Sequence, residues 1–141
     1  MAIYRVNYFD TLSVKEFRQF TDILRYYCKK KGVYFYSVFS STSSKAAHRE
    51  IVHTGQRGRP KAVVFGIPVR PHVHTVVVGD NAHSAAKQIC NALNRKAGKP
   101  ITRAVSLCDE VHLRNFVKYE ARQADIERSN AREFFEKLKR D

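Results

Sequence analysis

The sequence predicts an α+β protein in which an antiparallel sheet carries two helices on one face. Runs of β-branched and aromatic residues alternate along the chain with amphipathic helical patterns. The predicted order is strand, helix, strand, a hairpin-like pair of strands, helix, strand and a long helix. The 141 residues contain no repeat, linker or second compositional region, so we expect one domain over residues 1–141. This order leaves the other face of the sheet available for function.

The first helix has the clearest local signals. Residues 2–9 predict a first strand, and Ser13 with Glu16 then forms a capping box. Apolar residues continue at helical spacing until three lysines and Gly32, a pattern that is typical of a helix end. Residues 33–40, VYFYSVFS, predict a strong strand.

The middle of the chain predicts short strands and turns. Residues 41–49 are small and polar, 50–53 suit a short strand, and 54–61 read as a basic turn. Residues 62–66 and 72–79 predict a hairpin of two strands, joined by a link that contains Pro68 and Pro71. Asp80 is expected to cap the next helix, which Gly98 ends. The apolar stripe of that helix comprises Ala82, Ala85, Ala86, Ile89, Cys90 and Leu93.

The end of the chain predicts one more strand and one long helix. Residues 101–108 suit the strand, and residues 110–138 suit the helix. The stretch from Arg132 to Asp141 ends in the middle of a helical pattern, so we expect this domain to be the N-terminal part of a longer protein.

The charge balance predicts a polyanionic partner. The chain has 26 Lys and Arg against 13 Asp and Glu, a formal net charge of +13. A basic surface gains affinity for nucleic acid by displacing counterions from phosphates. A membrane partner is not expected, because no helical pattern is basic on one face and strongly apolar on the other.

The three cysteines predict a reducing, cytoplasmic setting. Cys28, Cys90 and Cys108 lack metal-binding or redox spacing, and each has apolar neighbours, so we expect small buried hydrophobes. An odd count without a secretory signal fits a compartment without disulfides.

His72 and His74 form the sharpest motif, within the sequence RPHVHTVVVG. Side chains alternate across a strand, so both imidazoles point to one face, about 7 Å apart. Such a pair can bind one divalent ion. The alternative is two polar residues on a solvated face.

This His-hydrophobic-His triplet, running into a hydrophobic strand, resembles the HUH endonuclease superfamily. That superfamily includes rolling-circle replication initiators of plasmids, relaxases and single-tyrosine transposases. The resemblance implies an RRM-like (ferredoxin-like) antiparallel sheet with two packing helices. It also implies a C-terminal helix that bears a nucleophilic tyrosine.

Tyr119 suits that role. Tyr119-x-x-Arg122 is similar to the Y-x-x-K motif of replication initiators, and Tyr119-x-x-x-Gln123 resembles the single-tyrosine transposases. On a helix Tyr119, Arg122 and Gln123 share a face, and Lys118 or Arg122 is expected to stabilise developing charge. The alternatives are that Tyr119 packs in the core or that Tyr26 is the nucleophile.

The resemblance implies a third metal ligand, for which Gln123 is preferred, then Glu50; His53 is a further candidate. The alternative for Glu50 is an isolated surface carboxylate. Two imidazoles with an oxygen ligand suit Mg²⁺ or Mn²⁺ better than zinc.

Two basic segments are expected to grip the DNA backbone, and aromatic residues of the strand over 33–40 are expected to stack on unpaired bases. The alternative for each is a solvated loop or a buried strand. The predicted DNA-binding residues are Lys45, Arg49, Arg57, Arg59, Lys61 and Tyr36.

These observations predict a metal-dependent endonuclease that nicks single-stranded or melted DNA at an origin or transposon end. The expected intermediate is a 5′-phosphotyrosine. Rolling-circle replication initiation is preferred, a single-tyrosine transposase is second, and a non-catalytic nucleic-acid-binding module is the alternative from another class. A monomer and a dimer are both compatible with the sequence.

Overall fold

A computed structural model describes residues 1–8, 12–52, 61–107 and 109–140, with the backbone alone for 42–52 and 61–70. It confirms an α+β fold with an antiparallel sheet. The elements are β1 (Ala2–Tyr8), α1 (Val14–Lys31), β2 (Tyr34–Val52), β3 (Lys61–Gly79), α2 (Ala82–Ala97), β4 (Thr102–Ser106), α3 (Glu110–Gln123), β5 (Ile126–Ser129) and α4 (Arg132–Arg140).

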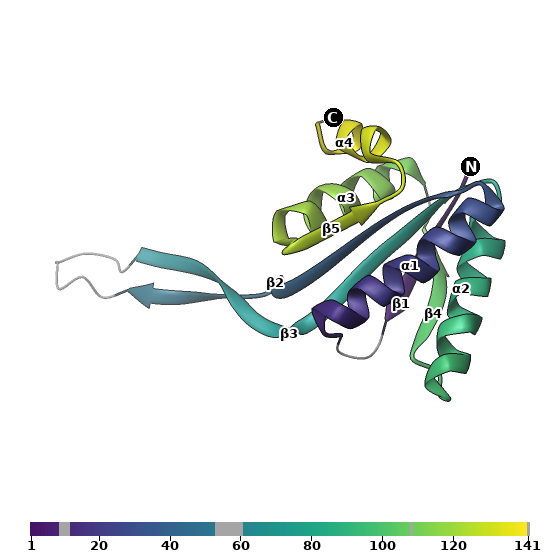
Figure 1. Ribbon diagram of the computed structural model, residues 1–141. Coiled ribbons are helices and arrows are strands. Elements are labelled where there is room, and N and C mark those ends of the chain that lie inside the picture. Colours follow the sequence, from purple (N-terminus) through teal and green to yellow (C-terminus); the bar gives the residue numbers. More distant parts are fainter. Residues whose placement is uncertain (9–11, 53–60, 108, 141) are drawn as a thin grey trace.

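The five strands form one sheet in the order β4-β1-β3-β2-β5, and every neighbouring pair is antiparallel (Figure 1). β3 therefore lies in the centre, between β1 and β2. Because successive side chains of a strand point to opposite faces, β3 contributes residues to two separate cores, one on each side of the sheet.

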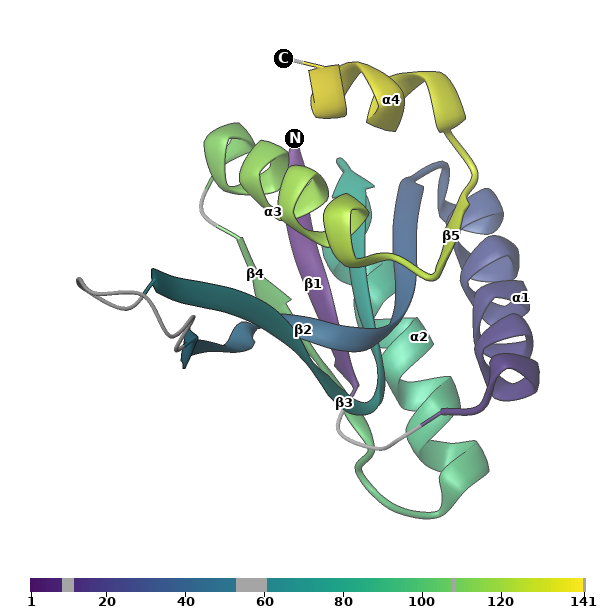
Figure 2. The same cartoon turned by 90° about the vertical axis from the view of Figure 1, so that its left-hand side faces the viewer.

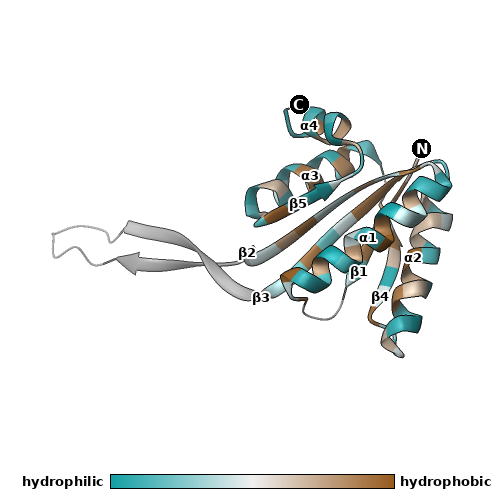
Figure 3. Cartoon of the chain, viewed as in Figure 1, coloured by the Kyte–Doolittle hydropathy of each residue, from teal (hydrophilic) through white to brown (hydrophobic). Residues whose placement is uncertain are grey.

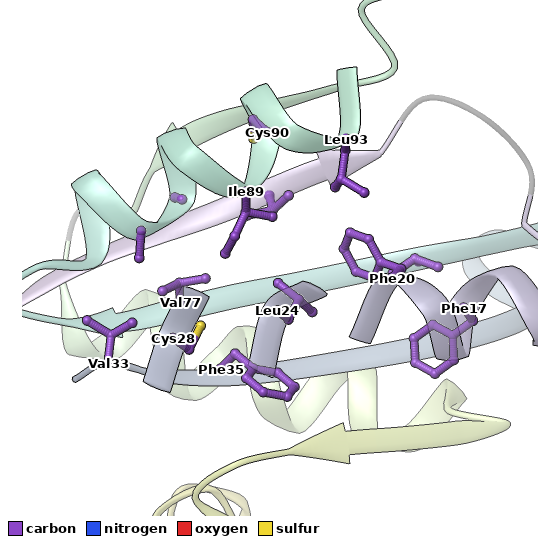
Figure 4. Packing of buried hydrophobic residues seen from close by; sticks show 14 of the residues in the cluster. Phe17, Phe20, Leu24, Cys28, Val33, Phe35, Val77, Ile89, Cys90 and Leu93 are labelled. Atoms are coloured by element: carbon purple, nitrogen blue, oxygen red, sulfur yellow. The ribbon is translucent and has the colours of Figure 1, made fainter. Parts of the chain in front are cut away.

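Helices α1 and α2 cover the first face and build the larger core. The apolar side of α1 contributes Phe17, Phe20 and Leu24, which pack towards Phe35 of β2 and Val77 of β3 (Figure 4). All five of these side chains are buried. The outward sides of both helices are mostly hydrophilic (Figure 3), so the two helices are held by their inner faces.

Helices α3 and α4 lie on the second face (Figure 2). Leu113 and Val117 of α3 and Phe135 of α4 are buried against Val76 of β3 and Tyr36 of β2. Two helices pack on one face as expected, but the expectation that the other face is left free is wrong. The second face is partly covered, and this covering helps to build the candidate site.

The local signals for the first two helices are confirmed, except at one cap. The Ser13 side chain accepts a hydrogen bond from the Glu16 backbone, the reciprocal bond is also present, and Gly32 ends α1 with φ 66°. The six predicted apolar residues of α2 are all buried. However, Asn81 and not Asp80 is the N-cap residue of α2.

The middle of the chain differs most from the prediction. Residues 41–52 belong to the long strand β2, and one strand, β3, replaces the predicted hairpin, so Pro68 and Pro71 do not interrupt it. β1 pairs with β3 only as far as Asn7–His74, while β2 and β3 go on pairing to Val52–Lys61. The part of β2 after Ser40 and the part of β3 before His72 form a two-stranded arm that leaves the sheet (Figure 1).

The single long helix over 110–138 is also wrong, because α3 stops at Gln123 and β5 intervenes. Asn130 explains the interruption: its side chain accepts a hydrogen bond from the backbone of Phe35 at 2.8 Å and donates one to Val33 at 3.0 Å. These bonds hold β5 along the edge of β2 and satisfy backbone groups there. Within the described ranges, none of the helices has the length and apolar character that crossing a bilayer requires.

Candidate functional site

His72 and His74 lie on β3 where the arm joins the sheet. They occupy the same face as Val76, the face that carries α3 and α4. Both side chains are half-buried, and their ring centroids are 4.8 Å apart with an interplanar angle of 84°. The sequence prediction of two neighbouring imidazoles on one face therefore agrees with the structure.

Helix α3 brings a carboxylate to this pair. Oε2 of Glu120 lies 3.7 Å from Nε2 of His74, and the ring of Phe116 lies edge-on to His74 at 6.3 Å between centroids. Glu120 is only 5% exposed. A buried carboxylate costs free energy unless a cation or hydrogen-bond donors accompany it, so its position beside His74 points to a functional role.

The sequence analysis missed Glu120, although a signal for it was present. Leu113, Val117 and Glu120 recur at the helical spacing of one face, and the first two are fully buried. A charged residue on an apolar stripe has to find a partner within the protein.

Tyr119 and Gln123 lie towards the histidine side of α3. Residues three and seven positions after Phe116 share its side of the helix, and Phe116 contacts His74. The backbone carbonyl of Gln123 accepts a hydrogen bond from Ser40 Oγ at 2.7 Å. Ser40 pairs with His72 across β2 and β3, so the end of α3 lies beside the histidine pair.

Lys118 and Arg122 lie on α3 on either side of Glu120, and their role in stabilising developing charge stays a prediction. Each lies two residues from Glu120, and two residues correspond to about 200° around an α-helix. Glu120 is buried on α3, whereas Lys118 is half-buried and Arg122 is exposed.

Glu50 is too distant to be the third metal ligand. It pairs with Val63 in the arm, whereas His72 pairs with Ser40 at the base. The nine residues from Val63 to His72 correspond to about 30 Å of extended strand. This correction leaves Glu120 and Gln123 as the candidate oxygen ligands on α3.

Most of the predicted DNA-binding side chains are not described. Arg57 and Arg59 lie outside the described residues, as does the further ligand candidate His53. Lys45, Arg49 and Lys61 belong to the arm, where the structure gives the backbone alone.

Tyr36 is described, and it does not offer a stacking surface. Its side chain is 1% exposed, lies under Phe135 and donates a hydrogen bond to Glu127 at 2.7 Å. Burial, followed by the bond to Glu127, raises the pKa of its hydroxyl far above the ordinary range. Tyr36 is therefore a structural residue of the second core, and its predicted role in stacking on bases is wrong.

The donor set at the base of the arm suits a divalent ion in part. A nitrogen and an oxygen that coordinate the same ion lie roughly 3.0–4.2 Å apart, as do His74 Nε2 and Glu120 Oε2. That separation exceeds a hydrogen bond. As placed, no three His, Cys, Asp or Glu side chains of the described residues form a complete metal-binding group. His72, whose ring lies 4.8 Å from that of His74, is a further donor at the pair.

No protein-family model, no curated protein and no solved structure matches this chain. The geometry of the site is therefore the basis of the function proposed below.

Proposed function

We propose that this chain is a metal-dependent endonuclease domain that nicks single-stranded DNA through a covalent bond to Tyr119. The main support is the meeting of His72 and His74, from β3, with the buried carboxylate of Glu120, the residue that follows Tyr119 on α3. Strand and helix are distant in sequence, and the face on which they meet belongs to a chain with net charge +13. An RRM-like sheet of the HUH type is part of this proposal.

The residues have distinct roles. Tyr119 Oη attacks the phosphorus, the bond to the 3′-oxygen breaks, and the strand is left joined to the tyrosine through its 5′-phosphate. The phenolic proton passes to water, and the released 3′-oxygen takes up a proton. The energy of the phosphodiester is kept in the new bond, so the strand can be resealed or transferred without ATP.

His72, His74 and Glu120 would hold a Mg²⁺ or Mn²⁺ ion, with Gln123 as the alternative oxygen donor. When bound, that ion would neutralise the scissile phosphate and so compensate for the poor nucleophilicity of a phenol with pKa near 10. The half-buried setting of the histidines supports this assignment, because it leaves room for a phosphate beside them.

Rolling-circle replication initiation is the preferred setting, since Tyr119 has no second tyrosine nearby in sequence. A single-tyrosine transposase is the second candidate. The observation that favours it is the position of Gln123, one turn after Tyr119 and at the end of α3 that is bonded to Ser40.

The test is incubation with a labelled pool of single-stranded oligonucleotides and Mn²⁺, read on a denaturing gel. We expect a protein–DNA adduct that disappears in Tyr119→Phe. Tyr26→Phe is the matched control, because Tyr26 is 62% exposed on α1, on the opposite face of the sheet. Binding without any adduct would instead indicate a non-catalytic nucleic-acid-binding module, and an adduct lost only in Tyr26→Phe would reassign the nucleophile.

A further inference from the structure

The sheet carries a polar row next to the histidine pair. Asn7 of β1 pairs with His74 on one side and with Arg103 of β4 on the other. Residues that are directly opposite each other in neighbouring strands point to the same face. Arg103, Asn7 and His74 therefore follow one another across three strands, on the face that carries α3.

A second arginine, Arg5, lies two residues before Asn7 on β1. Ile3 belongs to the core of the α3 face, so Arg5 points to that face as well. Arg5 is half-buried, and its Nε is buried without a hydrogen-bond acceptor among the described residues. A buried donor without an acceptor is costly, and a bound ligand can supply one.

The surface around Arg103 and Asn7 is less covered by helices than the core beneath α3 and α4. α3 crosses the sheet from the β4 side towards β5 (Figure 2), and its close backbone approaches are to β2 and α4. Arg103 is exposed, and Arg5 and Asn7 are half-buried. The row is thus accessible from solvent and continuous with the histidines.

We propose that Arg103, Asn7 and Arg5 bind the phosphodiester backbone of single-stranded DNA next to the phosphate held at His72 and His74. This inference rests on the proposed function and adds the path of the substrate: the strand crosses β1 and β4. Neighbouring strands are about 4.8 Å apart, so Arg103 lies roughly 10 Å from His74 along the row.

The side-chain chemistry suits this ligand. Guanidinium groups bind phosphate oxygens through paired N–H donors, and the Asn7 amide adds a neutral donor between them. Such contacts fix the position of the strand and do not read its sequence.

The test measures binding alone, in a Tyr119→Phe background where no adduct forms. Fluorescence anisotropy with a labelled single-stranded oligonucleotide is recorded over a range of salt concentrations. Arg103→Ala should weaken binding roughly threefold to tenfold and lower the slope of log K against log salt by about 0.7, the loss of one phosphate contact to a single strand. Arg5→Met should act similarly, and Arg5→Lys should recover part of the affinity.

Arg95→Ala is the matched control, because Arg95 is an exposed arginine on α2, which packs on the opposite face. The proposal is overturned if Arg103→Ala and Arg5→Met bind with the affinity and salt slope of the parent. It is also overturned if Arg95→Ala weakens binding as much, since that would indicate diffuse attraction to the whole surface. Competition by inorganic phosphate as effective as that of the oligonucleotide would indicate a simple anion site.

The two proposals fail separately. An adduct in the wild-type protein together with unchanged binding in the arginine variants removes the path and leaves the nickase. Weakened binding in those variants, with no adduct from the wild-type protein, supports the path and contradicts the nickase.

Discussion

Nε2 of His74 on β3 and Oε2 of Glu120 on α3 lie 3.7 Å apart, at the boundary between the open sheet and its second core. The carboxylate is almost completely buried, and the imidazole is 40% exposed. A buried carboxylate thus lies beside an imidazole that solvent can reach.

Glu120→Gln keeps the shape of this side chain and removes its charge. We expect an unchanged or higher melting temperature without metal, because a buried charge is lost. The Mn²⁺ affinity should fall about tenfold or more. The increase in melting temperature on adding Mn²⁺ should become smaller as a result. Calorimetric titration and thermal melts measure both, with the exposed Glu133 of α4, as Glu133→Gln, for control. An unchanged Mn²⁺ response in Glu120→Gln would remove Glu120 from the site.

The stability of the protein should depend on the protonation of Asp109, the N-cap residue of α3. The Asp109 carboxylate accepts hydrogen bonds from the backbone N–H of His112 at 3.0 Å and from its ring at 2.7 Å, and these bonds lower the pKa of Asp109. A lowered folded-state pKa gives stability that is present above the unfolded value of 3.8 and is lost as the pH falls through the folded value.

The check is the difference in melting temperature between the wild-type protein and Asp109→Asn, whose amide cannot titrate. We expect the wild-type protein to be the more stable at pH 6, and the difference to shrink as the pH falls below about 4. A difference that stays constant over this range would contradict the assignment.

The thiols of Cys28 and Cys90 should be unreactive in the folded protein. Burial raises the pKa of Cys28 to about 12, and burial also raises that of Cys90, opposed by a hydrogen bond with Thr102. At pH 8 a thiol with pKa 12 is a thiolate in roughly one molecule in ten thousand. Iodoacetamide labelling followed by peptide mass spectrometry should modify both cysteines only after denaturation; rapid labelling of Cys28 in the native protein would contradict its placement in the core.

Asn130→Ala should release the edge strand β5. The substitution removes a hydrogen bond to Phe35 of β2 and one to Val33 just before β2. It leaves the Phe35 N–H without its acceptor, at an expected loss of about 1–3 kcal/mol in the free energy of unfolding. Urea denaturation measures this loss. Asn91→Ala on the exposed side of α2 is the control and should change stability by only a few tenths of a kcal/mol.

The sequence predicted the elements whose signals are local. The capping box at Ser13, the glycine ends of α1 and α2 and the apolar stripe of α2 depend on residues within one or two turns of each other. The hydrogen bonds that fasten β5 beside β2 come from Asn130, which lies nearly a hundred residues after Val33 and Phe35. No local sequence pattern predicts this contact. The polar residues at 41–49 likewise suggested a loop, although their backbone pairs with β3.

The candidate site divides in the same way. The shared face of His72 and His74 follows from strand alternation, which any strand would give. That Glu120, and not Glu50, meets them depends on how α3 crosses the sheet and on where the arm begins, which are tertiary features. Arg5 and Asn7 are polar residues that alternate with apolar ones in the first strand. Only the register of that strand with β3 and β4 shows that they lie near the histidines.

Helix α3 is fastened to the sheet at both ends. Before it, Leu107 donates a backbone hydrogen bond to Ile3 at 2.9 Å; after it, Ser40 bonds to Gln123 and Asp125 donates to the carbonyl of Phe39 at 2.9 Å. A dimer that exchanged this helix between protomers would have to break these bonds twice over, once in each copy, and remake them across the interface. Within one chain, α3 already lies beside the histidine pair, so the proposed nickase would have Tyr119 and its own histidines in a single copy.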